Sequence, residues 1–156
     1  MNAMLVLSRD GDCAVVATRD FAASAERVWQ AHRDPSLLAR WMPAPEGWAL
    51  TTCDPGTCPG DLILLEWSNG LGSRFALTGA LLDLDPPHRM LHVERLHLPD
   101  PGPETVVETL LTPTPGGCHL TLTLTLPDTA AREALMAGDT AQGMETGYAT
   151  LDSLLD

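Results

Sequence analysis

Basic residues are scarce in this chain, which has 9 Lys and Arg residues against 21 Asp and Glu residues. The resulting formal net charge of -12 predicts an acidic surface. Such a surface repels the phosphate backbone of nucleic acids and the anionic faces of membranes. The composition therefore argues against nucleic acid as a partner and against attachment to a membrane surface.

Long apolar runs are also missing. No stretch approaches the roughly 20 apolar residues that a membrane-spanning helix needs. Residues 1–12 have neither the basic region nor the apolar region of a secretory signal. We therefore expect a cytoplasmic protein without membrane insertion, in which residues 1–12 form a poorly ordered or edge segment.

Cysteine occurs at only four positions, and Cys13 and Cys118 stand alone in the sequence. Cys53 and Cys58 lie closer together, in the string CDPGTC. The cysteines and the scattered histidines lack the spacing of metal ligands, and disulfide frameworks belong to secreted proteins. We expect four reduced thiols, no metal and no other cofactor. A Cys53–Cys58 bridge across the turn is the alternative.

Apolar residues are plentiful, at 44% of 156 positions, which is enough to build the core of one domain spanning residues 1–156. Two short helices are expected near the beginning. Ser24 is a favoured N-cap for the first, which lies within the segment of residues 21–34. Asp34 and Pro35 begin the second, because aspartate caps a helix and proline suits its first position. Pro43 ends it.

The hydrophobic period changes to two along the middle of the chain, which predicts strands. The clearest pattern lies in residues 117–126, where leucines at even positions alternate with threonines at odd positions. One face of this strand therefore packs on a core and the other meets water. Counting one strand before the helices, seven strands are expected, over residues 13–20, 48–54, 61–69, 73–85, 88–97, 104–112 and 117–126.

A long helix is predicted over residues 128–156, where apolar residues recur at helical spacing. Gly138, Gly143 and Gly147 lower its helix propensity by about 1 kcal/mol each relative to alanine. These glycines indicate a kink, or a place where the helix approaches the sheet closely. The apolar stripe consists of Leu135, Met136, Met144, Tyr148, Leu151, Leu154 and Leu155.

This order of elements, together with several local strings, resembles the START-like helix-grip (SRPBCC) superfamily. The closest resemblance is to bacterial homologues of the C-terminal domain of the heat-shock-chaperone ATPase activator. The strings are ERVWQAHRDPSLLARWM, CPGD, LTGALLDLDPPHRML, GGCHLTLTLTL and GMETGYATLDSLL. The resemblance implies an α+β fold in which a curved antiparallel sheet of about seven strands wraps a long C-terminal helix. Two short helices follow the first strand.

A sheet that wraps a helix leaves a gap, and strand alternation predicts what lines it. The resemblance places one face each of two strands inward, and the helices add further residues. We expect an apolar pocket for a small apolar or amphipathic ligand. Its candidate residues are Trp29, Trp41, Ile63, Leu65, Trp67, Phe75, Met90, His92, Glu94, Met144 and Tyr148.

His92 and Glu94 are the sharpest polar candidates in this pocket. Desolvation there would raise the pKa of the glutamate and lower that of the histidine, giving groups suited to acid–base chemistry. The simpler interpretation, which we favour, is a core histidine bonded to backbone and a glutamate at an exposed strand end. Residues two apart on a strand are about 7 Å apart and need not touch.

Three functions are compatible with the sequence. A ligand-binding module ranks first, because no nucleophile motif and no phosphate loop is present. An enzyme of cyclase or hydrolase type, using His92, Glu94 and Tyr148, ranks second, although no residue is assigned a catalytic role. A chaperone-associated or other protein-binding domain ranks third. Leu62 and Leu64 bear on this last hypothesis, because an apolar pair on the outer sheet face predicts a homodimer or partner surface.

Overall fold

The computed structural model describes residues 4–156, and these form one antiparallel sheet of eight strands with four helices. The predicted α+β class with one antiparallel sheet is confirmed. In chain order the elements are β1 Val6–Asp10, β2 Ala14–Phe21, α1 Ala25–Arg33, α2 Pro35–Trp41, β3 Ala49–Asp54, β4 Leu62–Ser68, β5 Arg74–Asp85, β6 Arg89–His97, β7 Thr105–Thr114, β8 Gly117–Thr125, α3 Thr129–Ala137 and α4 Thr140–Leu155.

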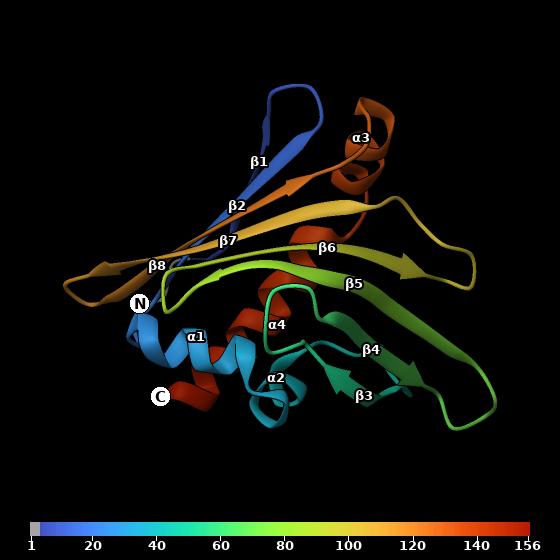
Figure 1. The fold of residues 1–156 in the computed structure, drawn as a ribbon, viewed down its shortest axis with the longest axis horizontal. Coiled ribbons are helices and arrows are strands. Elements are labelled where there is room, and N and C mark those ends of the chain that lie inside the picture. Colours follow the sequence, from blue (N-terminus) through green and yellow to red (C-terminus); the bar gives the residue numbers. More distant parts are fainter. Residues whose placement is uncertain (1–3) are drawn as a thin grey trace.

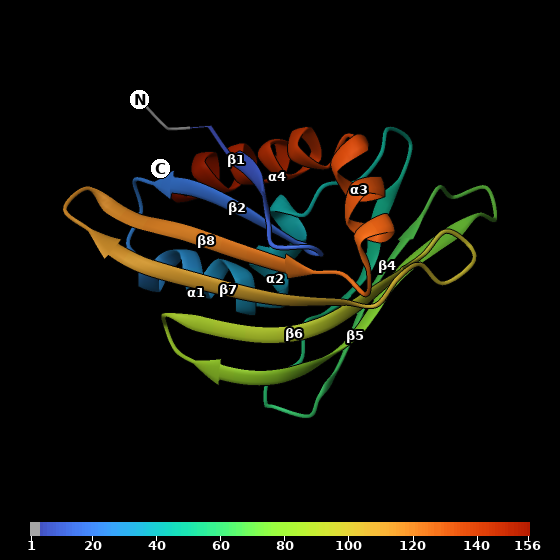
Figure 2. The ribbon, with the colours of Figure 1, turned by 90° about the horizontal axis from the view of Figure 1, so that it is seen from above.

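The strands lie in the order β1-β2-β8-β7-β6-β5-β4-β3, so β2 pairs with the last strand and not with the next one. The sheet curves strongly, and α4 lies along its concave side with α1 and α2 beside it (Figures 1 and 2). The expected number of seven strands is wrong by one. The additional strand is β1, an edge strand within the segment 1–12, whose first three residues lie outside the described part.

Both short helices begin at the residues that the sequence predicts. The Ser24 hydroxyl accepts a hydrogen bond from the Arg27 backbone N–H, which satisfies one free donor at the start of α1. The Asp34 carboxylate accepts from the Ser36 N–H at 2.9 Å and caps α2. The two helices therefore follow each other with only one residue between them.

The C-terminal segment differs from the expectation of one long helix. It is divided into α3, which ends at Ala137, and α4, which begins at Thr140. Gly138 stops α3, and the Thr140 hydroxyl donates to the Leu135 carbonyl oxygen at 3.0 Å across the break. The sequence predicted a kink or a close approach to the sheet at this glycine. The structure instead shows a break, at which one helix ends and another begins.

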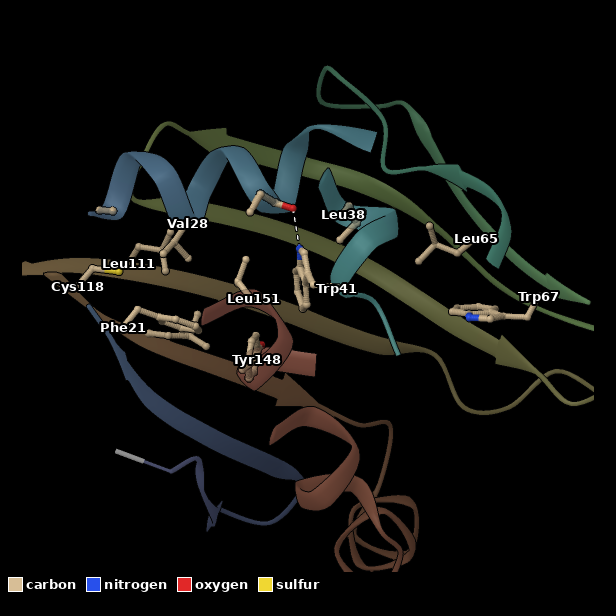
Figure 3. Close-up of a cluster of buried hydrophobic side chains, with 13 residues drawn as sticks. Phe21, Val28, Leu38, Trp41, Leu65, Trp67, Leu111, Cys118, Tyr148 and Leu151 are labelled. Atoms are coloured by element: carbon tan, nitrogen blue, oxygen red, sulfur yellow. Dashed lines mark hydrogen bonds between the residues drawn. The ribbon is translucent and has the colours of Figure 1, made fainter. Parts of the chain in front are cut away.

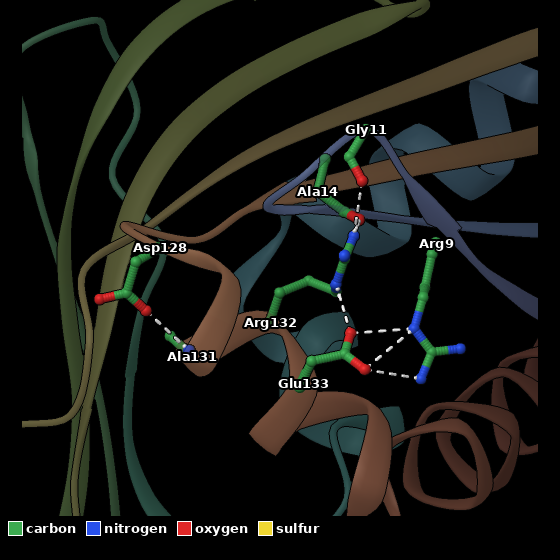
Figure 4. Close-up of polar contacts among 7 residues, drawn as sticks. All are labelled: Arg9, Gly11, Ala14, Asp128, Ala131, Arg132 and Glu133. Atoms are coloured by element: carbon green, nitrogen blue, oxygen red, sulfur yellow. Dashed lines mark hydrogen bonds and ion pairs between the residues drawn. The ribbon is translucent and has the colours of Figure 1, made fainter.

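Polar contacts fix α3 to the β1–β2 hairpin (Figure 4). The buried Arg132 guanidinium donates to the carbonyl oxygens of Gly11 and Ala14 at 3.1 and 3.0 Å. Glu133 accepts hydrogen bonds from Arg9, and these lower the pKa of its carboxyl group to about 2. The contacts of Arg132 and Glu133 with the β1–β2 hairpin therefore hold α3 at the edge of the sheet.

The alternation in β8 is confirmed by burial. Leu120, Leu122, Leu124 and the following Leu126 are at most 8% exposed, while Thr125 is exposed. The leucines face the core, whose larger cluster includes aromatic residues from β2, α2 and α4 (Figure 3). A shift of one residue in register would expose all of these leucines, so the pattern also fixes how β8 pairs.

The opposite face of the sheet carries Leu62, whose residue surface is 76% exposed, and the half-buried Leu64. This is the face that the sequence predicts for them, because Ile63 and Leu65 are buried on the other side. Whether a second copy of the chain covers this face stays a prediction. Within residues 4–156, no helix has the length and apolar character needed to cross a membrane.

Candidate ligand cavity

A cavity of about 410 Å³ lies between the concave face of the sheet and the helices. Its walls come from α1 and α2, from the inward residues of β4 to β8, and from α3 and α4. Most of its lining is apolar. Eight of the predicted pocket residues line it, namely Trp41, Ile63, Leu65, Met90, His92, Glu94, Met144 and Tyr148.

The other three predicted residues do not line the cavity: Trp67 is buried in the core, and Trp29 and Phe75 are partly buried and pack against it. Trp67 faces inward as expected, but its indole stacks on Phe75 with the ring centroids 4.7 Å apart. Its Nε1–H donates to the Pro43 carbonyl oxygen at 3.2 Å. The loop after α2 therefore covers this end of β4, and Trp67 is packed against it.

Several lining residues were not among the candidates. His32 and Arg33 come from the last turn of α1, and Thr109 comes from the inner face of β7. Leu122 and Leu124 belong to the leucine face of β8, for which only a role in the core was predicted. The alternation of β7 and β8 contained the signal for these strand residues, whereas nothing in the sequence indicates where the end of α1 lies.

Tyr148 is held on α4 by other aromatic rings (Figure 3). It lies between Trp41, stacked with a centroid distance of 5.6 Å, and Phe21, which meets it edge to face at 5.6 Å. Burial raises the pKa of the Tyr148 hydroxyl, so this group stays protonated at neutral pH. Trp41 is fixed in turn by donation from its Nε1–H to the Ala31 carbonyl oxygen at 2.9 Å.

His32 lies deep in the protein on the α1 side of the cavity. Its Nδ1 is 2.8 Å from the Val28 carbonyl oxygen. The centroid of its ring lies 4.9 Å from the centroid of the Trp41 ring. Loss of hydration lowers the pKa of the imidazole to about 4, with smaller contributions from the charges of Arg33 and His92. The ring is therefore neutral at pH 7. Because a carbonyl oxygen only accepts, Nδ1 carries the proton.

His92 and Glu94 touch, which corrects the favoured interpretation of two separate side chains. The His92 Nε2 lies 2.7 Å from the Glu94 Oε1, and both side chains are less than one third exposed. The two Cα atoms are separated along the strand, but these side chains are long enough to bend toward each other on the same face. The structure thus holds a histidine–carboxylate pair at the cavity wall.

Arg33 contributes a positive charge to the same cavity. One guanidinium nitrogen donates to the carbonyl oxygens of Pro55 and Gly56, at 2.9 and 2.6 Å. Burial lowers the pKa of this guanidinium from its ordinary value. No carboxylate pairs with it among residues 4–156, nor does any group of three metal-ligating side chains gather in this part of the chain.

A comparison with known protein families matches most of the chain to a single family. Residues 22–156 match the family described as Activator of Hsp90 ATPase homolog 1-like protein. This agrees with the resemblance that the sequence strings carry. The comparison with curated proteins finds no match.

Solved structures show the same fold over nearly the whole chain. A crystal structure of a protein from Rhodobacter sphaeroides is 32% identical, covers 97% of each chain and superposes with a TM-score of 0.85. A protein from Mycobacterium smegmatis is 21% identical with the same coverage and a TM-score of 0.82. A protein from Chromobacterium violaceum is 23% identical, covering 91% of this chain and 96% of its own, with a TM-score of 0.73.

Proposed function

The chain belongs to the family of Activator of Hsp90 ATPase homolog 1-like proteins, and we propose that it is a binding module for a small apolar or amphipathic ligand. The observation that carries this proposal is the cavity of about 410 Å³ between the sheet and the C-terminal helix. Its volume falls in the range of about 300 to 1,000 Å³ that is typical of small-molecule sites.

The chemistry of the walls supports an apolar ligand body. Ile63, Leu65, Leu122 and Leu124 present aliphatic side chains to the cavity, and Trp41 presents an aromatic one. An unfilled apolar space weakens a core, because its lining atoms lose contacts that close packing would provide. A ligand that fills the space restores these contacts, and it stabilises the folded state by binding only to it.

Neighbouring valines on β7 provide a matched test of this proposal. Val107 lines the cavity and is 3% exposed, whereas Val106 is on the outer face and 36% exposed. Val107→Phe places a ring in the ligand space, so we expect it to abolish ligand binding. Val106→Phe adds the same ring outside and should leave binding unchanged. Binding is measured by thermal shift and native mass spectrometry with a panel of apolar and amphipathic compounds.

Circular dichroism must show that both variants keep the fold, since overpacking costs about 1 to 3 kcal/mol. If no compound in the panel raises the melting temperature of the unsubstituted protein, the proposal is wrong. It is equally wrong if Val107→Phe binds the same compounds with unchanged affinity.

The His92–Glu94 pair favours a second candidate function, acid–base catalysis on a ligand in the same cavity. A histidine oriented by a carboxylate at 2.7 Å is a common arrangement for moving a proton. The Tyr148 hydroxyl is the third member of the hypothesis, but it makes no hydrogen bond to either residue. Incubation of the bound compound with the protein and with His92→Ala, followed by mass spectrometry, tests for a histidine-dependent chemical change.

A further inference from the structure

Three polar atoms on the cavity wall have no hydrogen-bond partner among residues 4–156. They are the Tyr148 hydroxyl on α4, the Thr109 hydroxyl on β7 and the Nε2 of His32 on α1. Tyr148 is only 6% exposed and Thr109 only 3% exposed. Polar groups so deeply placed are normally satisfied, so each unpaired one requires an explanation.

These atoms face the cavity itself. Within the described residues, no side-chain nitrogen or oxygen is both sealed from solvent and without a partner. The three unpaired atoms must therefore border an open space, and the space that their residues share is the ligand cavity. The rings of His32 and Tyr148 are neighbours at this cavity wall, with 6.4 Å between their centroids.

The hydrogen-bonding roles of these groups are fixed by their surroundings. Because the Nδ1 proton of His32 goes to the Val28 carbonyl, its Nε2 can only accept a hydrogen bond while the ring is neutral. The protonated Tyr148 hydroxyl can donate one. A single ligand group that both donates and accepts would satisfy the two residues together, and a neutral hydroxyl is the simplest such group.

We propose that the ligand carries an uncharged hydroxyl group, as in a phenol or an alcohol, that donates to His32 and accepts from Tyr148. This inference rests on the proposed binding function and specifies the ligand class. The apolar remainder of the molecule lies against the leucine face of β8.

An anionic head group is the competing chemistry, because Arg33 lacks a carboxylate partner among the described residues. The hydroxyl is favoured for three reasons. The Glu94 carboxylate borders the same cavity and repels an anion. An anion in the cavity also loses its hydration, and the neutral His32 ring offers no positive charge to compensate that loss. One nitrogen of the Arg33 guanidinium already donates to two carbonyl oxygens.

Three ring-matched probes separate these chemistries by isothermal titration calorimetry at neutral pH, namely naphthalene, 2-naphthol and 2-naphthoate. We expect 2-naphthol to bind most tightly. Tyr148→Phe keeps the ring but removes the hydroxyl, so it should weaken 2-naphthol binding about fivefold and leave naphthalene binding unchanged. His32→Phe should have a similar effect. The control Thr123→Val removes a hydroxyl from the opposite face of β8 and should change neither affinity.

The double variant shows whether both residues hold the same group. If one ligand hydroxyl bridges them, the effects of Tyr148→Phe and His32→Phe on 2-naphthol binding will not add. Equal affinities for naphthalene and 2-naphthol overturn this inference while the proposed binding function stands. Tightest binding of 2-naphthoate overturns it in favour of an anionic ligand. Failure of all three probes to bind contradicts the proposed function and this inference with it.

Discussion

His32 shows how strongly position changes the behaviour of a residue type. Its imidazole is enclosed by Trp41, Tyr148 and the backbone of its own helix, so hydration of a positive charge is lost there. His119, by contrast, lies on the surface, where its Nδ1 is 2.6 Å from the Asp20 carboxylate. Burial of one histidine in its neutral form couples the stability of the fold to pH.

The His32 pKa predicts a loss of stability in acid. The folded-state pKa of about 4 is lower than the ordinary 6.5, so the unfolded chain binds more protons between these two pH values. Stability therefore falls as pH decreases from 6.5 to 4, by roughly 3 kcal/mol from this residue. We expect His32→Phe to lose this part of the pH dependence, measured by urea unfolding across the range.

Other carboxylates and histidines also titrate in this range, so the informative quantity is the difference between the two proteins at each pH. The difference should change with pH between 4 and 6.5 and become constant above about 7. Parallel curves at all pH values would show that His32 is not buried as the structure describes.

At the scale of elements, two glycines on α4 differ sharply although they are four residues apart. A Cβ atom at Gly143 would meet nothing within 4 Å. A Cβ atom at Gly147 would lie 3.0 Å from the Pro43 Cγ and 3.5 Å from the Trp41 carbonyl oxygen. Gly147 therefore allows α4 to approach the end of α2 closely, whereas Gly143 only lowers the helix propensity.

Alanine substitutions at these glycines should accordingly have different effects on stability. Gly143→Ala is expected to stabilise the fold by up to about 1 kcal/mol, the usual difference in helix propensity. Gly147→Ala gains the same propensity but displaces the Pro43 ring, and it should be neutral or destabilising. Urea unfolding of both variants measures the difference, and a Gly147→Ala protein as stable as Gly143→Ala would contradict the close approach.

The same elements show what sequence patterns predict and where they fail. The leucine alternation of β8 and the caps at Ser24 and Asp34 were predictable, because each depends on residues within a few positions. The division of the terminal helix was only partly predictable. Gly138 marks the break, but the direction of α3 depends on Arg132 contacts with a hairpin more than 100 residues earlier.

The candidate site follows the same division. Alternation grouped Ile63, Met90 and Glu94 with their neighbours on shared strand faces, and the family resemblance placed those faces inward. All three residues line the cavity. Alternation could not show that His92 bends toward Glu94, nor that the last turn of α1 brings His32 to the cavity. Such contacts depend on side-chain conformation and on how helices cross the sheet, and neither leaves a periodic signal in the sequence.

In the whole molecule, the cavity exists only while α4 stays against the sheet, and Arg19 on β2 is a main connection between them. Its side chain is 2% exposed and pairs with two carboxylates of α4, Glu145 at 2.8 Å and Asp152 at 2.8 Å. Its guanidinium also lies 4.9 Å from the centre of the Phe21 ring. Hydrogen bonding from Arg19 lowers the pKa of Glu145, so the pair remains charged at neutral pH.

Removal of this cation should loosen the whole fold. Arg19→Met keeps an apolar stem against Phe21 but leaves two carboxylates without their shared positive charge, which we expect to cost about 2 to 4 kcal/mol. The control Arg9→Met breaks the pair with Glu133, in which both side chains are about half exposed, and should cost much less because solvent screens an exposed pair. Because Arg19 does not line the cavity, any accompanying loss of ligand affinity reports the displacement of α4. Urea unfolding and calorimetry with a bound compound measure the two effects, and equal costs for both variants would show that Arg19 does not hold the helix in place.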